Sequence, residues 1–222
     1  TPAAPGAFTQ VTGGATINWA PGAVKTWTGT TSTDWSVATN WSPSGVPIFS
    51  EDVTIPAAPP NQPTLGTTGN VGSLTVQAGA TLTLNGTFTF NVNGDLDVSG
   101  TMALAAGAPT LDLRGAGRTV RGNIPINTGF SGSYTLNGAT DVAGALSVGG
   151  GGSSLTLAGF FLSAASVNVG SGGLLIMTAG SDFLDVAGNV TMGGGDHTGR
   201  LTNGVMQVGG NFLQTSAGST LS

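Results

Sequence analysis

The alternation of apolar and polar residues between Leu74 and Leu104 limits the possible folds more than any other feature. Throughout this stretch every even-numbered position is apolar or glycine, whereas the odd-numbered positions are nearly all Thr, Ser, Asn, Gln or Asp. A period of two places the two sets on opposite faces of a strand. A straight strand of this length would extend for roughly 100 Å, whereas most strands have about five or six residues. The chain must therefore bend repeatedly while the same set of residues stays inside.

A coil around a narrow apolar interior meets this requirement, because inward side chains stay inward through each gentle corner. Gly and Asn residues within the stretch supply the corners, since both tolerate backbone conformations that other residues avoid. The residues that we expect to face the interior are Leu74, Val76, Leu82, Leu84, Phe88, Phe90, Val92, Leu96 and Val98.

A short repeat, an apolar residue two positions before a glycine, supports the same architecture. Its glycines are Gly94, Gly115, Gly138, Gly159, Gly188 and Gly210. Most of them recur at nearly equal intervals, typical of one solenoid coil, and the longest interval predicts an insertion between Gly159 and Gly188. No segment has the apolar periodicity of a helix. We therefore predict an all-β chain that forms a parallel β-solenoid (β-helix) of roughly seven coils.

An antiparallel sandwich or meander is the alternative architecture, because it also combines alternation with glycine-rich turns. Asn-Gly pairs, which are typical of two-residue hairpins, occur at positions 85–86, 93–94, 137–138 and 203–204. The regular recurrence of the glycines and the unbroken phase from Leu74 to Leu104 favour the parallel arrangement.

The composition excludes several classes of function. Only 7% of the residues are charged, against roughly a quarter in an average domain, and the net charge is −5. Five cations in 222 residues are too few to line a phosphate-binding surface, which argues against nucleic acid as a partner. The absence of Cys excludes disulfides, Cys-rich zinc sites and thiol catalysis. No apolar run approaches the roughly 18 residues that span a bilayer, so we expect no membrane span.

Residues 1–64 form a separate head that precedes the solenoid of residues 65–222. The head breaks the alternation, is rich in proline and contains all four tryptophans, which are Trp19, Trp27, Trp35 and Trp41. The end of a solenoid exposes its apolar interior and unpaired strand edges, so it requires a cap. We expect the tryptophans to pack as part of that cap. The alternative is a platform on which sugar rings stack, because aromatic faces bind pyranoses through apolar contact.

The head also carries an ordered series of short motifs. They are Trp27-Thr28-Gly29, Asp34-Trp35, Ala38-Thr39-Asn40-Trp41, Gly45-Val46-Pro47 and Asp52-Val53-Thr54-Ile55-Pro56, followed by the coil sequence that begins at Leu74. This series resembles the start of β-helical regions in large secreted and cell-surface bacterial proteins. The resemblance covers residues 27–104 closely. It implies an extracellular or surface-anchored β-solenoid of the adhesin or surface-fibre type, and it carries no catalytic residues.

One group of ionisable residues near the C-terminus is the nearest approach to an active site. Glycoside hydrolysis uses two carboxylates about 5 to 10 Å apart, and a β-helical lyase also needs clustered ionisable side chains. We expect His197, which follows three glycines and Asp196, to lie on a mobile, solvated loop, and we expect no catalysis. The alternative is a carbohydrate-active β-helix enzyme or a carbohydrate-binding module. The members of the group are Asp182, Asp185, Asp196, His197 and Arg200.

The pattern of the other charged residues favours surface ion pairs over a catalytic site. Arg114, Arg118 and Arg121 have Asp112 and Asp141 as candidate partners, and surface ion pairs are the expected outcome.

Two further charged features have candidate chemical roles. Asp95 and Asp97 could bind Ca²⁺, although residues 193–201 do not match the glycine-rich nonapeptide of calcium-binding solenoids. We expect no other cofactor. Lys25 is the sole lysine, and its isolation alone suggests a covalent crosslink to Asn or Asp.

The two ends of the sequence suggest an assembly. The start contains strand-like segments around Phe8, Val11 and Ile17, and the last residues, from Leu213 to Leu221, resemble a coil that stops midway. An open strand edge can accept a strand from a neighbour, and an unlike head and tail would propagate as a filament. We therefore predict a non-enzymatic extracellular or cell-surface structural or adhesive protein that assembles head to tail, with surface polysaccharide as a further candidate partner.

Overall fold

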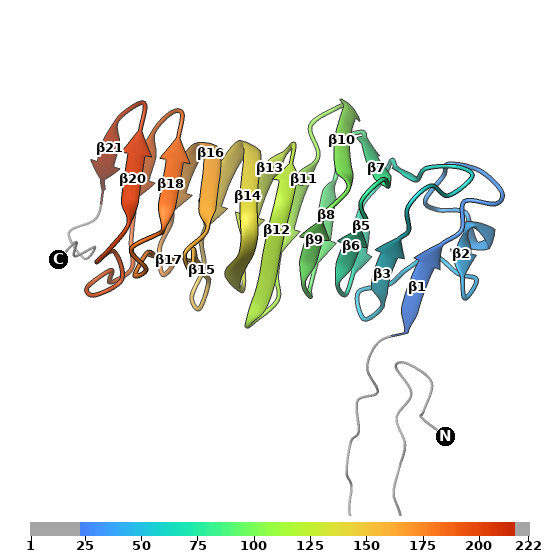
Figure 1. Ribbon diagram of the computed structural model, residues 1–222, viewed down its shortest axis with the longest axis horizontal. Helices are drawn as coiled ribbons and strands as arrows, with labels where there is room; N and C mark the ends of the chain where they lie inside the picture. Colours follow the sequence, from blue (N-terminus) through green and yellow to red (C-terminus); the bar gives the residue numbers. More distant parts are fainter. Residues whose placement is uncertain (1–22, 216–222) are drawn as a thin grey trace, which may run out of the picture.

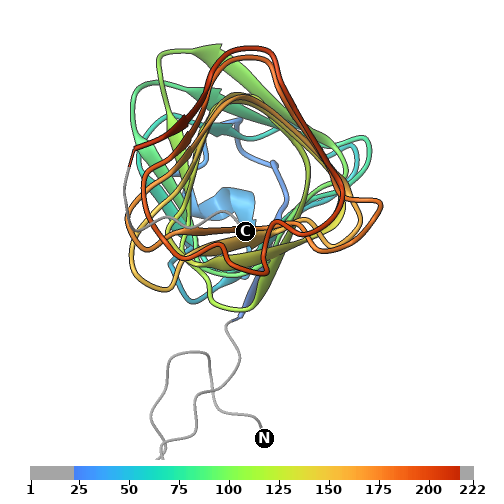
Figure 2. The same ribbon diagram turned by 90° about the vertical axis from the view of Figure 1, so that its left-hand side faces the viewer.

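The computed structural model describes residues 23–215, which wind into a parallel β-solenoid of about eight turns. The coils stack along one axis (Figure 1), and the view along that axis shows a roughly triangular outline (Figure 2). Within the described residues the only helical element is the 3-10 turn η1 (Ala38–Asn40). The predicted fold class is confirmed.

Each coil contributes strands to three faces of the solenoid, which we call A, B and C in chain order. Face A contains β1 (Val24–Trp27), β3 (Asp52–Ile55), β6 (Leu74–Val76), β9 (Leu96–Val98), the start of β12 (Arg118–Ile124), the start of β14 (Ser133–Val148), β15 (Ser154–Thr156) and β17 (Leu174–Ile176). Because β14 is the longest described strand, it bends around two corners and contributes to all three faces.

Face B begins with a three-stranded sheet and continues with the second half of β12 and the middle of β14. Its other strands are β4 (Thr64–Leu65), β7 (Thr81–Asn85), β10 (Thr101–Ala106), the first half of β16 (Phe161–Val169), β18 (Phe183–Val186) and β20 (Val205–Val208). Face C contains β5 (Gly69–Val71), β8 (Thr89–Val92), β11 (Thr110–Leu113), β13 (Asn127–Phe130), the ends of β14 and β16, β19 (Val190–Met192) and β21 (Phe212–Gln214).

Almost every pairing between these strands is parallel. The antiparallel exception among the described strands is β1 with β2 (Trp41–Ser42). The Asn-Gly pair at 93–94 makes no hairpin, because the amides of Asn93 and Gly94 donate to carbonyls of the preceding coil, at Val71 and Gly72. The antiparallel alternative is therefore wrong for this chain.

The register of the ladders gives the length of each coil. On face B, Leu162 pairs with Leu184, and Leu184 pairs with Met206, so the last coils have equal lengths. The predicted insertion between Gly159 and Gly188 is absent. The two glycines lie at different corners, since Gly159 contacts the turn at Asp182 and Gly188 donates to Ala165, so the interval between them is not a coil length.

Coils in the middle of the solenoid depart from this length: the steps from Leu111 to Thr128 and from Thr128 to Leu146 are shorter, and the step from Leu96 to Val120 is longer. Leu111 on β11 pairs with Thr128 on β13, and Val120 pairs with Leu136, which are both closer in sequence than Leu162 and Leu184 are. The hydroxyl of Tyr134 joins this region to earlier coils, because it accepts a hydrogen bond from the Gly115 amide (3.0 Å) and lies 2.9 Å from the Gly94 carbonyl. Burial raises the pKa of Tyr134 to about 12, which keeps its proton available for donation.

The interior follows the alternation of the sequence. All nine residues predicted to face inward are buried except Phe88, which is half-buried and packs against the core. The pattern ends at Leu104, which is 44% exposed although it is still in register with the buried Leu84. β10 is the edge strand of its three-stranded sheet, and a register shift follows between Leu104 and Ala106. Among the odd-numbered positions, Asn91 is buried with its side-chain oxygen lacking a partner.

The described part of the head packs against the first coils. Trp27, Trp35 and Trp41 are buried, with ring centroids 4.6 to 6.5 Å apart, and Trp35 contacts Phe90 of the solenoid core edge-on at 5.9 Å. The indole N–H of Trp27 donates to the Asn61 carbonyl and that of Trp41 to the Trp35 carbonyl, at 2.7 and 2.9 Å. Parallel stacking begins ahead of residue 65, because β1, β3 and β4 already belong to the ladders.

The buried Asn40 explains one of the head motifs. Its side-chain oxygen accepts hydrogen bonds from the amides of Thr31 and Ser32, and its side-chain nitrogen donates to Ser32 Oγ and the Asp34 carbonyl. All four bonds lie between 2.9 and 3.1 Å. Asn40 therefore fixes the loop that connects Trp27 to Trp35.

Candidate functional site

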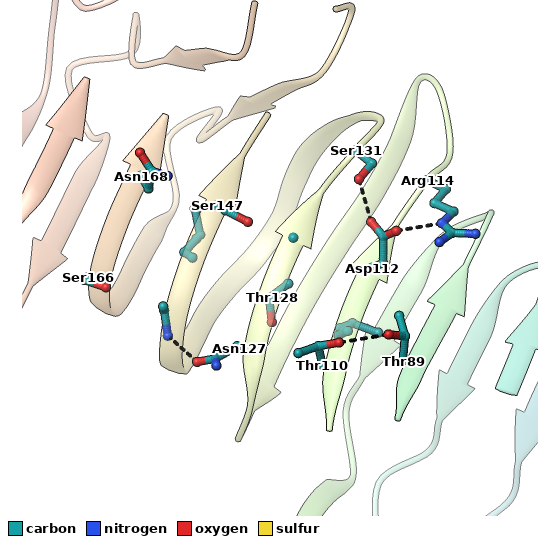
Figure 3. A pocket seen from close by; sticks show the side chains of 14 residues that line it. Thr89, Thr110, Asp112, Arg114, Asn127, Thr128, Ser131, Ser147, Ser166 and Asn168 are labelled. Atoms are coloured by element: carbon teal, nitrogen blue, oxygen red, sulfur yellow. Dashed lines mark hydrogen bonds and ion pairs between the residues drawn. The ribbon is translucent and has the colours of Figure 1, made fainter. Parts of the chain in front are cut away.

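A groove of about 530 Å³ lies on the outside of face C, across β8, β11, β13, β14 and β16 (Figure 3). Its volume is within the range of about 300 to 1,000 Å³ that is common for ligand sites. The lining residues are mostly hydroxyl and amide side chains: Thr89, Thr110, Leu111, Asp112, Arg114, Asn127, Thr128, Gly129, Ser131, Ala145, Leu146, Ser147, Ser166 and Asn168.

The polar lining follows from the pleat of the strands. Buried residues such as Leu111 and Leu146 point inward, so their neighbours along each strand point outward. Parallel register then aligns the outward residues of successive coils into rows. The row at the centre of the groove is Asp112, Gly129, Ser147 and Asn168, and the buried Asn91 is in register with Asp112 beyond the lining.

The second row lies one pleat away. Thr110 pairs with Thr89 on one side and with Asn127 on the other, and its hydroxyl is 3.2 Å from that of Thr89. The side-chain oxygen of Asn127 accepts a hydrogen bond of 2.8 Å from the Ala145 amide (Figure 3). These contacts hold the polar side chains in fixed positions along the edge of the groove.

Gly129 makes the central row concave. Its row neighbours Asp112 and Ser147 both carry side chains, whereas Gly129 leaves open space between them. A Cβ atom at this position would lie 3.4 Å from Ser147 Oγ and 3.8 Å from Asp112 Oδ1, which are ordinary contact distances. The hollow therefore exists because the side chain is absent, and not because the backbone needs glycine there.

One ion pair lies at the edge of the groove. The guanidinium Nε of Arg114 donates to Asp112 Oδ2 at 2.6 Å, and Ser131 Oγ donates to Asp112 Oδ1 at 2.7 Å. The Arg114 side chain is 47% exposed, so solvent screens this pair and its effect on stability is small. Asp112 is the single carboxylate and Arg114 the single cation among the lining residues.

His197 does not lie on a solvated loop, and that prediction is wrong. The ring is fully buried, and its Nε2 atom accepts a hydrogen bond of 3.2 Å from the Leu175 amide of β17. Nδ1 is also buried and has no partner. Gly195, with a φ of 84°, turns the chain back toward the core, which brings the imidazole inside.

The environment of His197 makes stability depend on pH. Burial lowers the pKa of His197 from its ordinary value of 6.5, and Arg200 lowers it further, whereas the Gly195 backbone and Asp196 oppose the shift. The unfolded chain therefore takes up a proton at a higher pH than the folded chain does. The free energy of unfolding then falls as the pH is lowered through about 6.5 toward the folded pKa.

We expect urea midpoints to fall between pH 7 and pH 5 in the wild type and to change less in His197→Gln. His197 is the only histidine, so few other side chains titrate in this window. Each chain is compared with itself at pH 7, so a general loss of stability in His197→Gln does not affect the measured change of its urea midpoint with pH. Equal slopes in the two chains would contradict the prediction.

The other members of the C-terminal ionisable group have separate environments. Asp182 is buried in a turn and accepts hydrogen bonds from the amides of Gly159 (2.5 Å) and Ala179 (2.9 Å). Asp185 pairs with Ser163 in the outward row of face B, and Asp196 accepts from the Thr198 amide at 2.9 Å in the loop. Arg200 donates its backbone amide to the His197 carbonyl.

Two of the three clustered arginines form ion pairs, one of them with a partner other than those expected. Arg114 binds Asp112, but Arg121 binds Asp97 of the preceding coil, with 2.5 Å between Nη2 and Oδ2. The predicted partner Asp141 instead accepts a hydrogen bond from Ser163. Arg118 is exposed at the start of β12.

The two carboxylates considered for calcium are bound by protein groups. Asp97 holds Arg121, and Asp95 Oδ1 accepts hydrogen bonds from the amide and hydroxyl of Thr119, at 2.7 and 3.0 Å. Within residues 23–215 no three His, Asp or Glu side chains form a group that could hold a metal ion.

The sole lysine is buried and points into the core, because Lys25 is in register with Val53. Its ammonium donates to the carbonyls of Pro43 and Ser44, at 3.0 and 3.1 Å, and lies 3.7 Å from Glu51. These contacts hold the head together, and none is with the side chain of an Asn or Asp.

The remaining predicted residues divide between buried, exposed and undescribed positions. The buried rings of Trp27, Trp35 and Trp41 leave no face for a sugar. Leu213 lies on β21 and is 45% exposed. Trp19, Phe8, Val11, Ile17 and Leu221 lie outside the described residues.

Sequence reasoning missed the groove because its residues are far apart in the chain. Thr89, Asn127 and Ser166 meet only through the register of successive coils. The available signal was the outward phase of the alternation, in which polar residues recur about one coil apart.

The parallel ladders and the continuous apolar interior define this chain as a β-solenoid protein. Residues 26–126, which are less than half of the chain, match the model of a family described as a domain of unknown function, DUF8693. The match spans the motifs of the head and the strands β8 and β11 of the groove. No curated protein and no solved structure matches the chain. Within the part of the chain that the structure describes, no helix is long and apolar enough to cross a membrane.

Proposed function

We propose that this chain is a non-enzymatic extracellular structural or adhesive protein that uses the outer side of face C as its contact surface. The observation that carries the proposal is the polar groove, in which side chains from five successive strands are held in register. A rigid scaffold with such an array can bind a ligand without rearrangement, which lowers the entropic cost of binding.

The chemistry of the groove supports binding over hydrolysis. Glycoside hydrolysis uses a pair of carboxylates, one of which must give or take a proton. Asp112 is the single carboxylate of the lining, and both of its oxygens already accept hydrogen bonds, from Arg114 and Ser131. The alternative is a carbohydrate-active β-helix enzyme or a carbohydrate-binding module, and the groove favours the binding module.

Head-to-tail assembly into a surface fibre is part of the proposal. Phe212 on β21 is in register with the buried Val190, yet it is 45% exposed, and the neighbouring Leu213, in register with Thr191, is exposed to the same extent. An apolar strand edge of this kind can accept a strand from a neighbouring copy. We expect the purified chain to sediment as oligomers that dissociate when residues 1–18 are deleted. A monomer that is unchanged by the deletion would contradict the assembly.

Incubation with a panel of neutral and acidic polysaccharides tests the non-enzymatic part of the proposal. We expect no release of new reducing ends or unsaturated products at any pH between 5 and 8. Product release that is lost in Asp112→Asn would overturn it, because this change removes the charge of the carboxylate and keeps its shape.

A further inference from the structure

We propose that the groove on face C binds a segment of neutral polysaccharide, which lies across the strands and along the solenoid axis. This inference rests on the proposed adhesive function and names the chemical class of its target. It follows from the spacing, the polar chemistry and the charge of the lining residues.

The spacing of the coils suits an extended glycan. Adjacent strands lie about 4.8 Å apart, which is close to the length of one hexose residue in an extended chain. Ser147 and Asn168, in register on β14 and β16, therefore face consecutive sugar positions. Thr89 and Thr110 do the same on β8 and β11. A polymer along the axis would meet at least one polar side chain on each strand of the groove.

The kinds of side chain also suit sugar hydroxyls. A hydroxyl group both donates and accepts hydrogen bonds, and Ser, Thr and Asn side chains can do the same. Ser147, Ser166 and Asn168 form one half of the groove (Figure 3). At the centre Gly129 leaves room for a ring to approach the backbone of β13.

The charge of the groove favours a neutral polymer over a polyanion. Arg114 is the one cation of the lining, and its charge is compensated by Asp112. The chain as a whole carries a net charge of −5. A glycan with a carboxylate on each sugar would therefore meet mostly uncompensated repulsion.

Filling the hollow at Gly129 tests the inference directly. Gly129→Thr places a β-branched side chain on a strand, where such residues are favoured, and its Cβ would lie no closer than 3.4 Å to another residue's atoms. Gly151→Thr is the matched control, since Gly151 lies in the turn after β14 with no other atoms near its Cβ position. Thermal melts should show that both variants keep the fold.

The measurement is calorimetric titration with hexasaccharides of β-1,4-linked glucose, mannose and xylose, and with a hexagalacturonate. We expect at least one neutral oligosaccharide to bind, with an affinity that falls tenfold or more in Gly129→Thr and stays unchanged in Gly151→Thr.

Three results would overturn the inference: no binding of any neutral oligosaccharide at millimolar concentration, equal affinity in wild type and Gly129→Thr, or preference for the galacturonate. Each leaves the non-enzymatic proposal intact, because that proposal fails only if products are released.

Discussion

Phe90→Asp is expected to prevent the chain from folding. Phe90 is fully buried on β8, contacts Trp35 at 5.9 Å and packs beneath Gly69, where an added Cβ would lie only 2.9 Å from the ring. Loss of a buried phenylalanine costs about 3 to 5 kcal/mol, and an unpaired buried carboxylate adds several more. The sum of these two costs is comparable to the whole free energy of unfolding of a typical domain, roughly 5 to 15 kcal/mol.

Thr89→Asp provides the matched control, because Thr89 is the preceding residue on the same strand and points outward. Urea denaturation followed by circular dichroism should show a folded Thr89→Asp chain and no folding transition in Phe90→Asp. If the two variants had similar midpoints, the assignment of inner and outer faces would be wrong.

Asn40→Ala is expected to lower the free energy of unfolding by more than about 3 kcal/mol. The change removes four hydrogen bonds and leaves the amides of Thr31 and Ser32 and the carbonyl of Asp34 without their side-chain partner. These bonds are partly buried, and each contributes about 1 kcal/mol, so the loss of four gives a large sum.

Two further variants separate the loss of the Asn40 hydrogen bonds from the effect of removing any asparagine side chain. Asn40→Asp keeps the acceptor for Thr31 and Ser32 but loses the donor, so we expect an intermediate loss of stability. Asn137→Ala, at an exposed position of β14, should change stability by less than about 0.5 kcal/mol. An Asn40→Ala chain as stable as Asn137→Ala would contradict the role of Asn40.

The interior of the solenoid is predictable because one physical rule, alternation with an apolar inside, operates along the whole coil. Leu74 to Val98 obey it, and the inward set follows residue by residue. Leu104 departs from it although it is in register with Leu84, because β10 is the edge strand of its three-stranded sheet, and the local alternation does not show where that sheet ends.

Other features depend on which residues the coils bring into register, and the local sequence pattern does not specify that register. The interval between Gly159 and Gly188 suggests an insertion only if both glycines belong to the same corner, and they do not. The glycine-rich neighbourhood of His197 resembles a solvated loop, whereas the chain folds back beneath β17. The groove depends on the missing side chain of Gly129, which matters only when Asp112 and Ser147 lie beside it.

The equal steps from Leu162 to Leu184 and Met206 show that the last coils share one length, which has a consequence for how such proteins change size. Because each coil contacts mainly the coils next to it, duplication of one coil adds about 4.8 Å of height and leaves the other contacts in place. Duplication or deletion of whole coils can therefore lengthen or shorten the molecule in fixed steps. A single-residue insertion within a strand would instead reverse the inner and outer residues that follow it.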